Sequence, residues 1–165
     1  DKLKNYNKNL KNTSAIFLQS NDETIEEGII YFGKERIRID YIKPEEISIV
    51  LSERKGMYIN HRLEETEYFN MKKSYVKFFL DIFSKDKYIE TKNIRVLNDS
   101  IEINETVFLD NNSFKIKIVY ENNPIKLRKI IVLENQQNLE MGFFDHKKID
   151  NPEKNFFSLI NPYLN

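Results

Sequence analysis

The sequence predicts a mainly β fold of the α+β class, built on one antiparallel sheet of ten or eleven strands with two helices. Segments rich in apolar and aromatic residues recur about every ten residues, which is typical of strands joined by hairpins. Polar turn residues separate these segments, and the connections are too short for the crossovers that parallel strands need. Because twist accumulates across so many strands, the sheet must be strongly curled.

The first element is a short amphipathic helix in residues 2–12, where Leu3, Tyr6 and Leu10 stand at helical spacing. A helix this short must dock on the rest of the chain to be stable. A turn is expected at 151–154, and an extended segment carries 156–159. Strands are predicted in residues 14–20, 26–33, 35–43, 46–53, 56–62, 65–70, 88–97, 100–109, 113–120, 125–134 and 138–146.

The second helix is expected in residues 71–83 and is apolar on more than one stripe. A helix of this kind needs cover over most of its circumference. Two interpretations remain open: an ordinary core helix, or a helix lying over an apolar hollow.

The strand in residues 35–43 indicates what the sheet buries. Ile37, Ile39 and Tyr41 point to one face, whereas Arg38 and Asp40 point to the other, outside or at the rim. If the apolar face is concave, it forms a trough that only the two helices can cover.

Composition excludes several functions. The 165 residues correspond to a single domain, 1–165, whose formal charge of zero argues against a nucleic-acid partner. No cysteine is present, and the spacing of His61 and His146 supports no metal site. No phosphate-binding loop or nucleophile elbow occurs. We therefore expect no enzyme, no catalytic residue, no metal and no cofactor.

The chain has no apolar run of the ~20 residues that a membrane-spanning helix needs. It begins at Asp1 rather than at Met. Either a signal peptide was removed before Asp1, or the chain was cut there for expression.

Several segments together resemble one family, LolA, the periplasmic carrier of outer-membrane lipoproteins. The run from Arg38 to Pro44 resembles the "R-W-E-Y-x-x-P" strand end of that family. The similarity covers residues 13–162 and depends on the order of the segments. The further matching segments are Phe17-Leu18-Gln19, Gly28–Phe32, Arg54–Asn60 and Asn151–Pro162.

The resemblance implies an incomplete β-barrel with a helical lid, like LolA and LolB. It also implies a cavity for the acyl chains of triacylated lipoproteins, received from an inner-membrane ABC transporter of the LolCDE type. An outer-membrane acceptor of the LolB type would take them where present. The protein would be a monomer in the periplasm, with its signal peptide removed.

The expected acyl-chain cavity combines the trough with the aromatic side chains of the second helix. Ile39 replaces an aromatic residue of the family, and Lys34 is the nearest match to a basic residue that latches the lid. Lysine lacks the fork of arginine and would be a weaker latch. The expected lining residues are Ile30, Phe32, Ile37, Ile39, Tyr41, Ile47, Ile49, Tyr75, Phe78, Phe79 and Phe83.

Two alternatives remain beside the lipoprotein carrier. One is a lipid- or glycolipid-binding module of the same fold that is not a general lipoprotein shuttle. The other is a hydrolase of amphiphiles, which needs a nucleophile that the sequence does not reveal.

Overall fold

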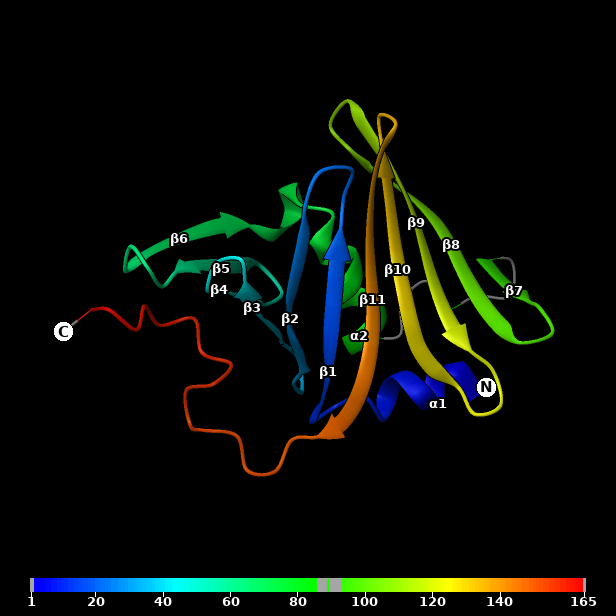
Figure 1. Ribbon diagram of the computed structural model, residues 1–165, viewed down its shortest axis with the longest axis horizontal. Coiled ribbons are helices and arrows are strands. Elements are labelled where there is room, and N and C mark those ends of the chain that lie inside the picture. Colours follow the sequence, from blue (N-terminus) through cyan, green and yellow to red (C-terminus); the bar gives the residue numbers. More distant parts are fainter. Residues whose placement is uncertain (1, 86–88, 90–92, 165) are drawn as a thin grey trace.

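The computed structural model describes residues 2–85, 89 and 93–164, and its strands form one antiparallel sheet of eleven (Figure 1). The strands lie in the order β6-β5-β4-β3-β2-β1-β11-β10-β9-β8-β7, so the sheet is open, with β6 and β7 at its edges. The expected mainly β fold is confirmed. The strands are β1 Thr13–Ser20, β2 Ile25–Phe32, β3 Ile37–Lys43, β4 Ile47–Leu51, β5 Lys55–Asn60, β6 Glu65–Asn70, β7 Ile94–Val96, β8 Ser100–Leu109, β9 Asn112–Glu121, β10 Lys126–Glu134 and β11 Gln137–Lys148.

Both helices are shorter than expected. Helix α1 is Lys2–Lys8, and turns continue to residue 12. The segment expected to be one helix divides into a 3₁₀ turn, η1 Met71–Lys73, and helix α2 Val76–Lys85. The division arises because the Asn70 side chain caps η1 and Ser74 then takes an extended backbone. Part of the strand expected at 88–97 lies outside the described residues, which place β7 at 94–96 only.

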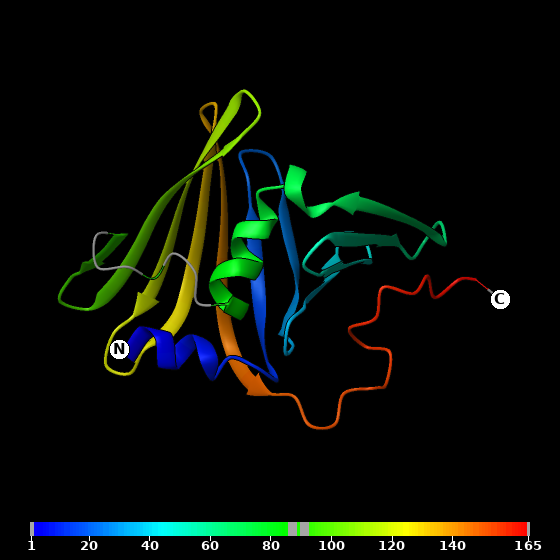
Figure 2. The same cartoon turned by 180° about the vertical axis from the view of Figure 1, so that it is seen from behind.

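The two faces of the sheet are covered differently. Both helices lie on its concave face (Figure 2), where the inward residues of nearly all strands form one hydrophobic core. Strand β9 shows how the sequence builds this core, because Phe114, Ile116, Ile118 and Tyr120 alternate with more exposed residues.

The chain after β11 returns along the outer face of β3 to β6 (Figure 1). We call residues 149–164 the C-terminal segment. Its turn lies at 154–157, later than expected. Leu159 and Tyr163 pack on a small outer cluster of Val50, Met57 and Ile59. Strand β4 therefore buries apolar side chains on both faces, with Leu51 in the core and Val50 in the outer cluster.

Helix α1 is fixed to the sheet by buried polar contacts. Asn7 donates from Nδ2 to the Ile82 carbonyl of α2 at 3.3 Å and accepts from the Tyr120 hydroxyl at 3.1 Å. The Tyr6 hydroxyl accepts from the Leu127 amide at 2.8 Å, beside a bulge in β10. We call Asn7, Tyr120 and the Ile82 carbonyl the α1 clasp.

Candidate functional site

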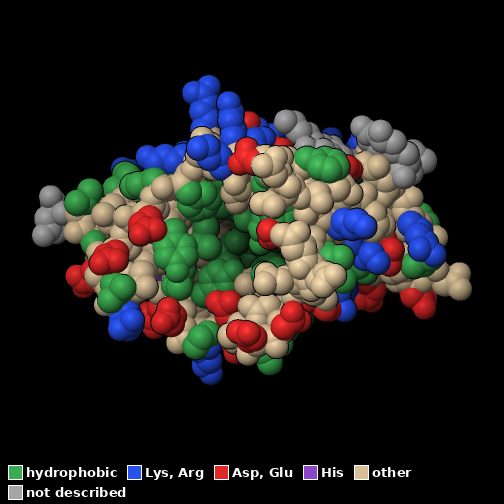
Figure 3. All heavy atoms as spheres, turned by 90° about the horizontal axis from the view of Figure 1, so that it is seen from above, with side chains coloured by type: hydrophobic (Ala, Val, Ile, Leu, Met, Phe, Trp, Pro, Cys, Tyr) green, Lys and Arg blue, Asp and Glu red, His purple; other side chains and the backbone are tan. Residues whose placement is uncertain are grey.

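An apolar cavity of about 190 Å³ lies between the concave face and α2. Seen from above, the molecule has a hollow lined with hydrophobic side chains (Figure 3). Strands β1 to β4, β6, β10 and β11 supply its walls, and α2 with the residues before it supplies its cover. The lining residues are Gln19, Ile30, Ile37, Ile39, Tyr41, Ile49, Leu51, Phe69, Ser74, Tyr75, Val76, Phe79, Phe83, Ile130, Leu139, Met141 and Phe143.

The pairing register of the strands determines which residues form the apolar floor of the cavity. Ile39 of β3 pairs with Ile30 of β2 on one side and with Ile49 of β4 on the other, so three inward isoleucines stand in a row. Neighbouring residues on antiparallel strands that pair in this way share one face of the sheet. A period of two along each strand is therefore enough to build the floor.

Two glycines leave room for aromatic rings beside the floor. A Cβ on Gly28 would lie 2.2 Å from the Asp40 carbonyl oxygen and 2.6 Å from the Phe17 ring. Phe17 and Tyr41 meet edge to face there, with ring centroids 5.2 Å apart. A Cβ on Gly56 would lie 2.1 Å from the ring of Phe69, which lines the cavity.

Helix α2 serves as both a core helix and a cavity cover, so both sequence interpretations apply. Phe78, Leu80 and Ile82 are buried in the core, whereas Tyr75 and Phe79 line the cavity and are only half-buried. Tyr75 and Phe79 also meet edge to face at 5.9 Å.

The structure brings most of the expected cavity residues together. Eight of them line the cavity: Ile30, Ile37, Ile39, Tyr41, Ile49, Tyr75, Phe79 and Phe83. Phe32 and Phe78 are buried in the core instead, and Ile47 is half-buried outside the lining. Phe32 lies outside the lining because its ring packs on Phe83 at 5.5 Å.

Sequence reasoning missed the wall formed by Ile130, Leu139, Met141 and Phe143. The alternation of apolar and polar residues in β10 and β11 indicated that one face of these strands is buried. That signal could not show which strands meet, because β11 joins β1 only through long-range pairing.

Four side chains with polar groups interrupt the apolar lining: Gln19, Tyr41, Ser74 and Tyr75. The Tyr41 hydroxyl donates to Oε1 of Gln19 at 2.8 Å, and Nε2 of Gln19 donates to Oε1 of Glu26 at 3.4 Å. Burial, followed by the Glu26 charge, raises the pKa of Tyr41. The tyrosine therefore stays neutral and acts as a hydrogen-bond donor in the cavity wall.

The expected latch residue, Lys34, is exposed in the β2–β3 turn, and no described residue forms an ion pair with it. A different lysine fixes the helix. Lys85, the last residue of α2, forms an ion pair with Glu53 in the β4–β5 turn. Because both side chains are partly exposed, this contact is weak and easily exchanged for water.

A larger groove of about 560 Å³ lies on the outer face of β8 to β10. It is lined by both lysines and apolar residues, among them Lys115, Lys117, Phe108 and Leu133. Phe108 and Leu133 are exposed, so this groove is an open surface depression, unlike the more enclosed cavity under α2.

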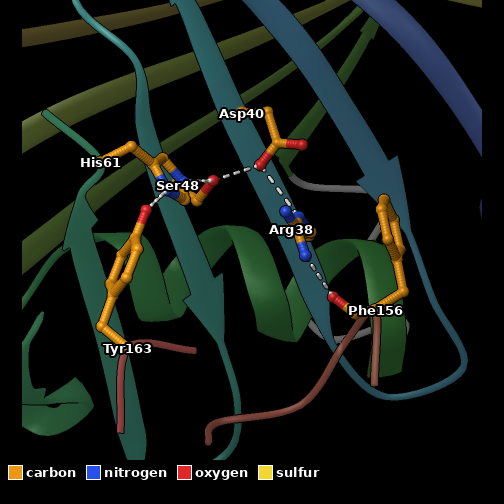
Figure 4. Close-up of polar contacts among 6 residues, drawn as sticks. All are labelled: Arg38, Asp40, Ser48, His61, Phe156 and Tyr163. Atoms are coloured by element: carbon orange, nitrogen blue, oxygen red, sulfur yellow. Dashed lines mark hydrogen bonds and ion pairs between the residues drawn. The ribbon is translucent and has the colours of Figure 1, made fainter. Parts of the chain in front are cut away.

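A serine, a histidine and an aspartate meet on the outer face (Figure 4). Ser48 Oγ lies 2.7 Å from Asp40 Oδ1 and 2.8 Å from His61 Nε2, and His61 Nδ1 lies 2.6 Å from the Tyr163 hydroxyl. In a catalytic triad the histidine stands between serine and carboxylate. Here the serine stands in the middle and is 3% exposed, so the arrangement lacks both the order and the access of a nucleophile.

The same contacts fix the C-terminal segment. Arg38 Nε donates to Asp40 at 2.9 Å and its Nη1 donates to the Phe156 carbonyl at 2.8 Å, with the guanidinium 4.3 Å from the Phe156 ring centroid. The network therefore joins two points of the C-terminal segment, Phe156 and Tyr163, through β3, β4 and the end of β5.

Within the described residues, no group of three or more histidine, aspartate or glutamate side chains could hold a metal ion. None of the helices in that part of the chain is long and apolar enough to span a membrane.

No model of a known protein family matches the sequence, and no curated protein matches it. Among solved structures, an uncharacterized conserved protein from Thermus thermophilus matches 93% of this chain and 90% of its own, with 8% identity and a TM-score of 0.59. That similarity shows a shared fold. The fold and site thus define an open antiparallel sheet curled around an apolar cavity beneath a helix.

Weaker structural neighbours include one protein named for lipoprotein sorting. A putative outer membrane lipoprotein-sorting protein domain from Vibrio parahaemolyticus has a TM-score of 0.48 and 7% identity over 94% of each chain. LprF from Mycobacterium bovis has a TM-score of 0.41 and 11% identity over 92% of this chain and 93% of its own. At these scores the two names carry no argument about this chain.

Proposed function

We propose that this protein binds the acyl tails of a lipid or a lipoprotein in the cavity under α2, without covalent chemistry. The observation that carries the proposal is an apolar cavity, open at one end, whose cover, Tyr75 and Phe79, is only half-buried. Hydrocarbon tails gain about 0.8 kcal/mol for each CH₂ group removed from water, so an apolar cavity needs no specific bonds to retain them.

The size of the cavity requires α2 to move. A cavity of roughly 150 Å³ accommodates one benzene molecule, so 190 Å³ holds only a short part of an acyl chain. A ligand with long tails must displace α2 from the sheet and occupy the space of its side chains. The structure is therefore proposed to be the closed state of a carrier whose open state is selected by the ligand.

The contacts at the two ends of α2 are compatible with such a movement, which would also have to break the buried hydrogen bond from Asn7 to the Ile82 carbonyl. Its N-terminal side follows the extended residue Ser74, and its last residue is held by the partly exposed pair of Lys85 and Glu53. The floor strands keep their own ladder of hydrogen bonds whether or not α2 is present. Displacement of α2 would thus leave the sheet intact.

The finer proposal follows the resemblance to LolA. The cargo would be triacylated lipoproteins, received at the inner membrane from a LolCDE-type transporter and released at the outer membrane. The protein would work in the periplasm as a monomer. Ile39→Glu is then expected to abolish lipoprotein release from inner-membrane vesicles, and unchanged release would argue against the cavity as the carrier site.

A direct binding test compares two substitutions in one strand. Ile39→Glu places a charge in the cavity, whereas Ile42→Glu places it at an exposed position three residues along β3. With a fluorescent long-chain probe, we expect the first variant to lose binding at least tenfold and the second to bind as the unmodified protein does. Equal binding by all three proteins would refute the proposal, provided that circular dichroism shows folded variants.

The small cavity volume also favours a second candidate, a module that binds one lipid or glycolipid molecule and is not a general shuttle. Native mass spectrometry of protein purified from its own host distinguishes the two. A triacylated polypeptide supports the shuttle, and a free lipid supports the module.

A further inference from the structure

At the upper end of the cavity, inward-facing positions of the strands are occupied by acidic rather than apolar side chains. Glu26 stands directly across from Gln19 in the β1–β2 ladder, on the same face as Gly28 and Ile30. Glu134 follows Ile130 and Val132 on the inward face of β10. Glu67 pairs with Tyr58, which pairs with Ile49 of the cavity floor. Strands β2 and β10 thus end their apolar inward rows in a glutamate, and β6 has Glu67 two residues before the lining residue Phe69. We call Glu26, Glu67 and Glu134 the rim carboxylates.

These carboxylates lie near tyrosines at this end of the cavity: Tyr75 lines the cavity, and Tyr58 pairs with the floor residue Ile49. Glu26 contacts the cavity residue Gln19 directly at 3.4 Å. After burial, the charge of Glu134 is the next cause that raises the pKa of Tyr75. Burial and then the charges of Glu45, Glu26 and Glu67 raise the pKa of Tyr58. The mouth of the cavity therefore combines aromatic rings with negative charge.

The rim carboxylates have no cationic partner among the residues that the structure describes. Some carboxylates elsewhere have one, such as Asp81 with Lys77 at 2.9 Å and Glu140 with Lys129 at 2.6 Å. Figure 3 shows acidic side chains beside the hydrophobic hollow, with Lys and Arg side chains at the upper edge above it and on the right of this view. The strand side of the opening is thus negative and has no internal counter-charge.

We propose that the ligand is an amphiphile with a cationic head group, whose tail enters the cavity while its head lies among the rim carboxylates. This inference rests on the proposed function, because the cavity is the site and the carboxylates act only on its choice of head group. Aromatic rings attract ammonium groups through the negative charge on their faces, and unpaired carboxylates add Coulomb attraction. A fatty acid carboxylate would meet repulsion at the same place.

The test uses three probes with the same twelve-carbon tail: dodecyltrimethylammonium, dodecyl maltoside and dodecanoate, each below its micelle concentration at pH 8. Titration calorimetry is expected to rank binding as cationic, then neutral, then anionic, with about tenfold between the first and the last. The preference should decrease as salt increases, because ions screen exposed charges. Equal binding of all three probes, or tighter binding of dodecanoate, would overturn the inference and leave the acyl-chain cavity standing.

Substitutions test whether the rim carboxylates cause the preference for a cationic head group. Glu26→Gln and Glu134→Gln are expected to reduce the cationic preference severalfold each. Glu27→Gln is the matched control, since Glu27 neighbours Glu26 but faces the outer side of β2 and should leave the preference unchanged. An equal effect of the control would refute the assignment to the rim. If no probe of any charge binds, the proposed function itself fails. The probe ranking on the unmodified protein is independent of the variants.

Discussion

The two halves of the concave face have the same inward alternation, yet one is packed solid and the other is hollow. Under α1, the inward residues Ile103, Ile116, Ile118 and Leu127 are at most 2% exposed. Under α2, Ile39, Tyr41 and Ile49 of β3 and β4 are only half-buried and line the cavity. We call these the packed half, β8 to β10, and the hollow half, β2 to β4.

The difference arises from the covers. Helix α1 is positioned by directional bonds, the α1 clasp and the Tyr6 hydroxyl, which hold it at one place on the sheet. Toward the hollow half, α2 presents large aromatic rings that contact the sheet by packing alone. Buried polar contacts specify position more strongly than apolar packing does. Helix α2 has one such contact, from Asn7 to its Ile82 carbonyl, whereas its rings over the cavity contact apolar side chains that another apolar body could replace.

On the outer face of the sheet, the hollow half is the better covered of the two halves. The C-terminal segment covers the outside of the hollow half and adjoining β5, whereas Leu18, Phe108 and Leu133 remain exposed on the other strands. A sheet that must keep its curvature around an empty space benefits from a second layer outside. The C-terminal segment supplies that layer, which explains why it carries so many polar contacts.

The largest expected effect is a loss of stability caused by a substitution in the packed half. Ile118→Ala should lower the free energy of unfolding by about 4 kcal/mol, because it opens a cavity in a site that cannot collapse. Ile39→Ala, beside existing empty space, should cost about 1 kcal/mol. Urea unfolding measures both. Equal losses would show that the two halves are packed alike.

A glycine pair tests the floor of the hollow half. Gly28→Ala should cost about 3 kcal/mol, because the new Cβ would collide with the Asp40 carbonyl and force β3 away. Gly142→Ala is the control, since nothing lies within 4 Å of its Cβ position. That variant should be neutral or slightly stabilising in thermal unfolding. A tolerated Gly28→Ala would contradict the close approach of β2 and β3.

The fold was predictable from these same local features. Strand positions from β1 to β6 follow the alternation and the turn residues within a few positions, because hairpins are set by neighbouring residues in the chain. Eight of eleven expected cavity residues lie in the lining for the same reason. The sequence could not show the wall from β10 and β11 or the pair of Lys85 and Glu53, because both depend on contacts between distant segments.

A smaller effect is expected from the outer layer of the hollow half. Arg38→Ala should lower stability by about 2 kcal/mol, since it removes charge-assisted bonds to Asp40 and to the Phe156 carbonyl. Arg38→Lys should recover only part of this loss, because an ammonium cannot replace the fork. Hydrogen exchange of β3 and β4 amides should accelerate in Arg38→Ala while β9 amides stay protected. Uniform acceleration would mean that the C-terminal segment does not act locally.

The smallest effect is a pH dependence confined to the packed half. His146 Nε2 lies 3.0 Å from the Leu127 carbonyl at the β10 bulge, and burial lowers the pKa of His146 below its usual 6.5. The nearby charges of Lys126 and Arg128 lower it further, against the opposing effects of the Leu127 carbonyl and Asp145. The folded protein therefore favours neutral histidine.

Its contribution to stability is complete above pH 6.5 and is lost as the pH falls from 6.5 through the lower pKa of the folded state. Urea unfolding at a series of pH values should show this slope in the unmodified protein and a shallower one in His146→Gln. Because the histidine lies beside the bulge that receives Tyr6, acid should loosen α1 before α2. Identical slopes in the two proteins would show that His146 titrates alike in the folded and unfolded chain.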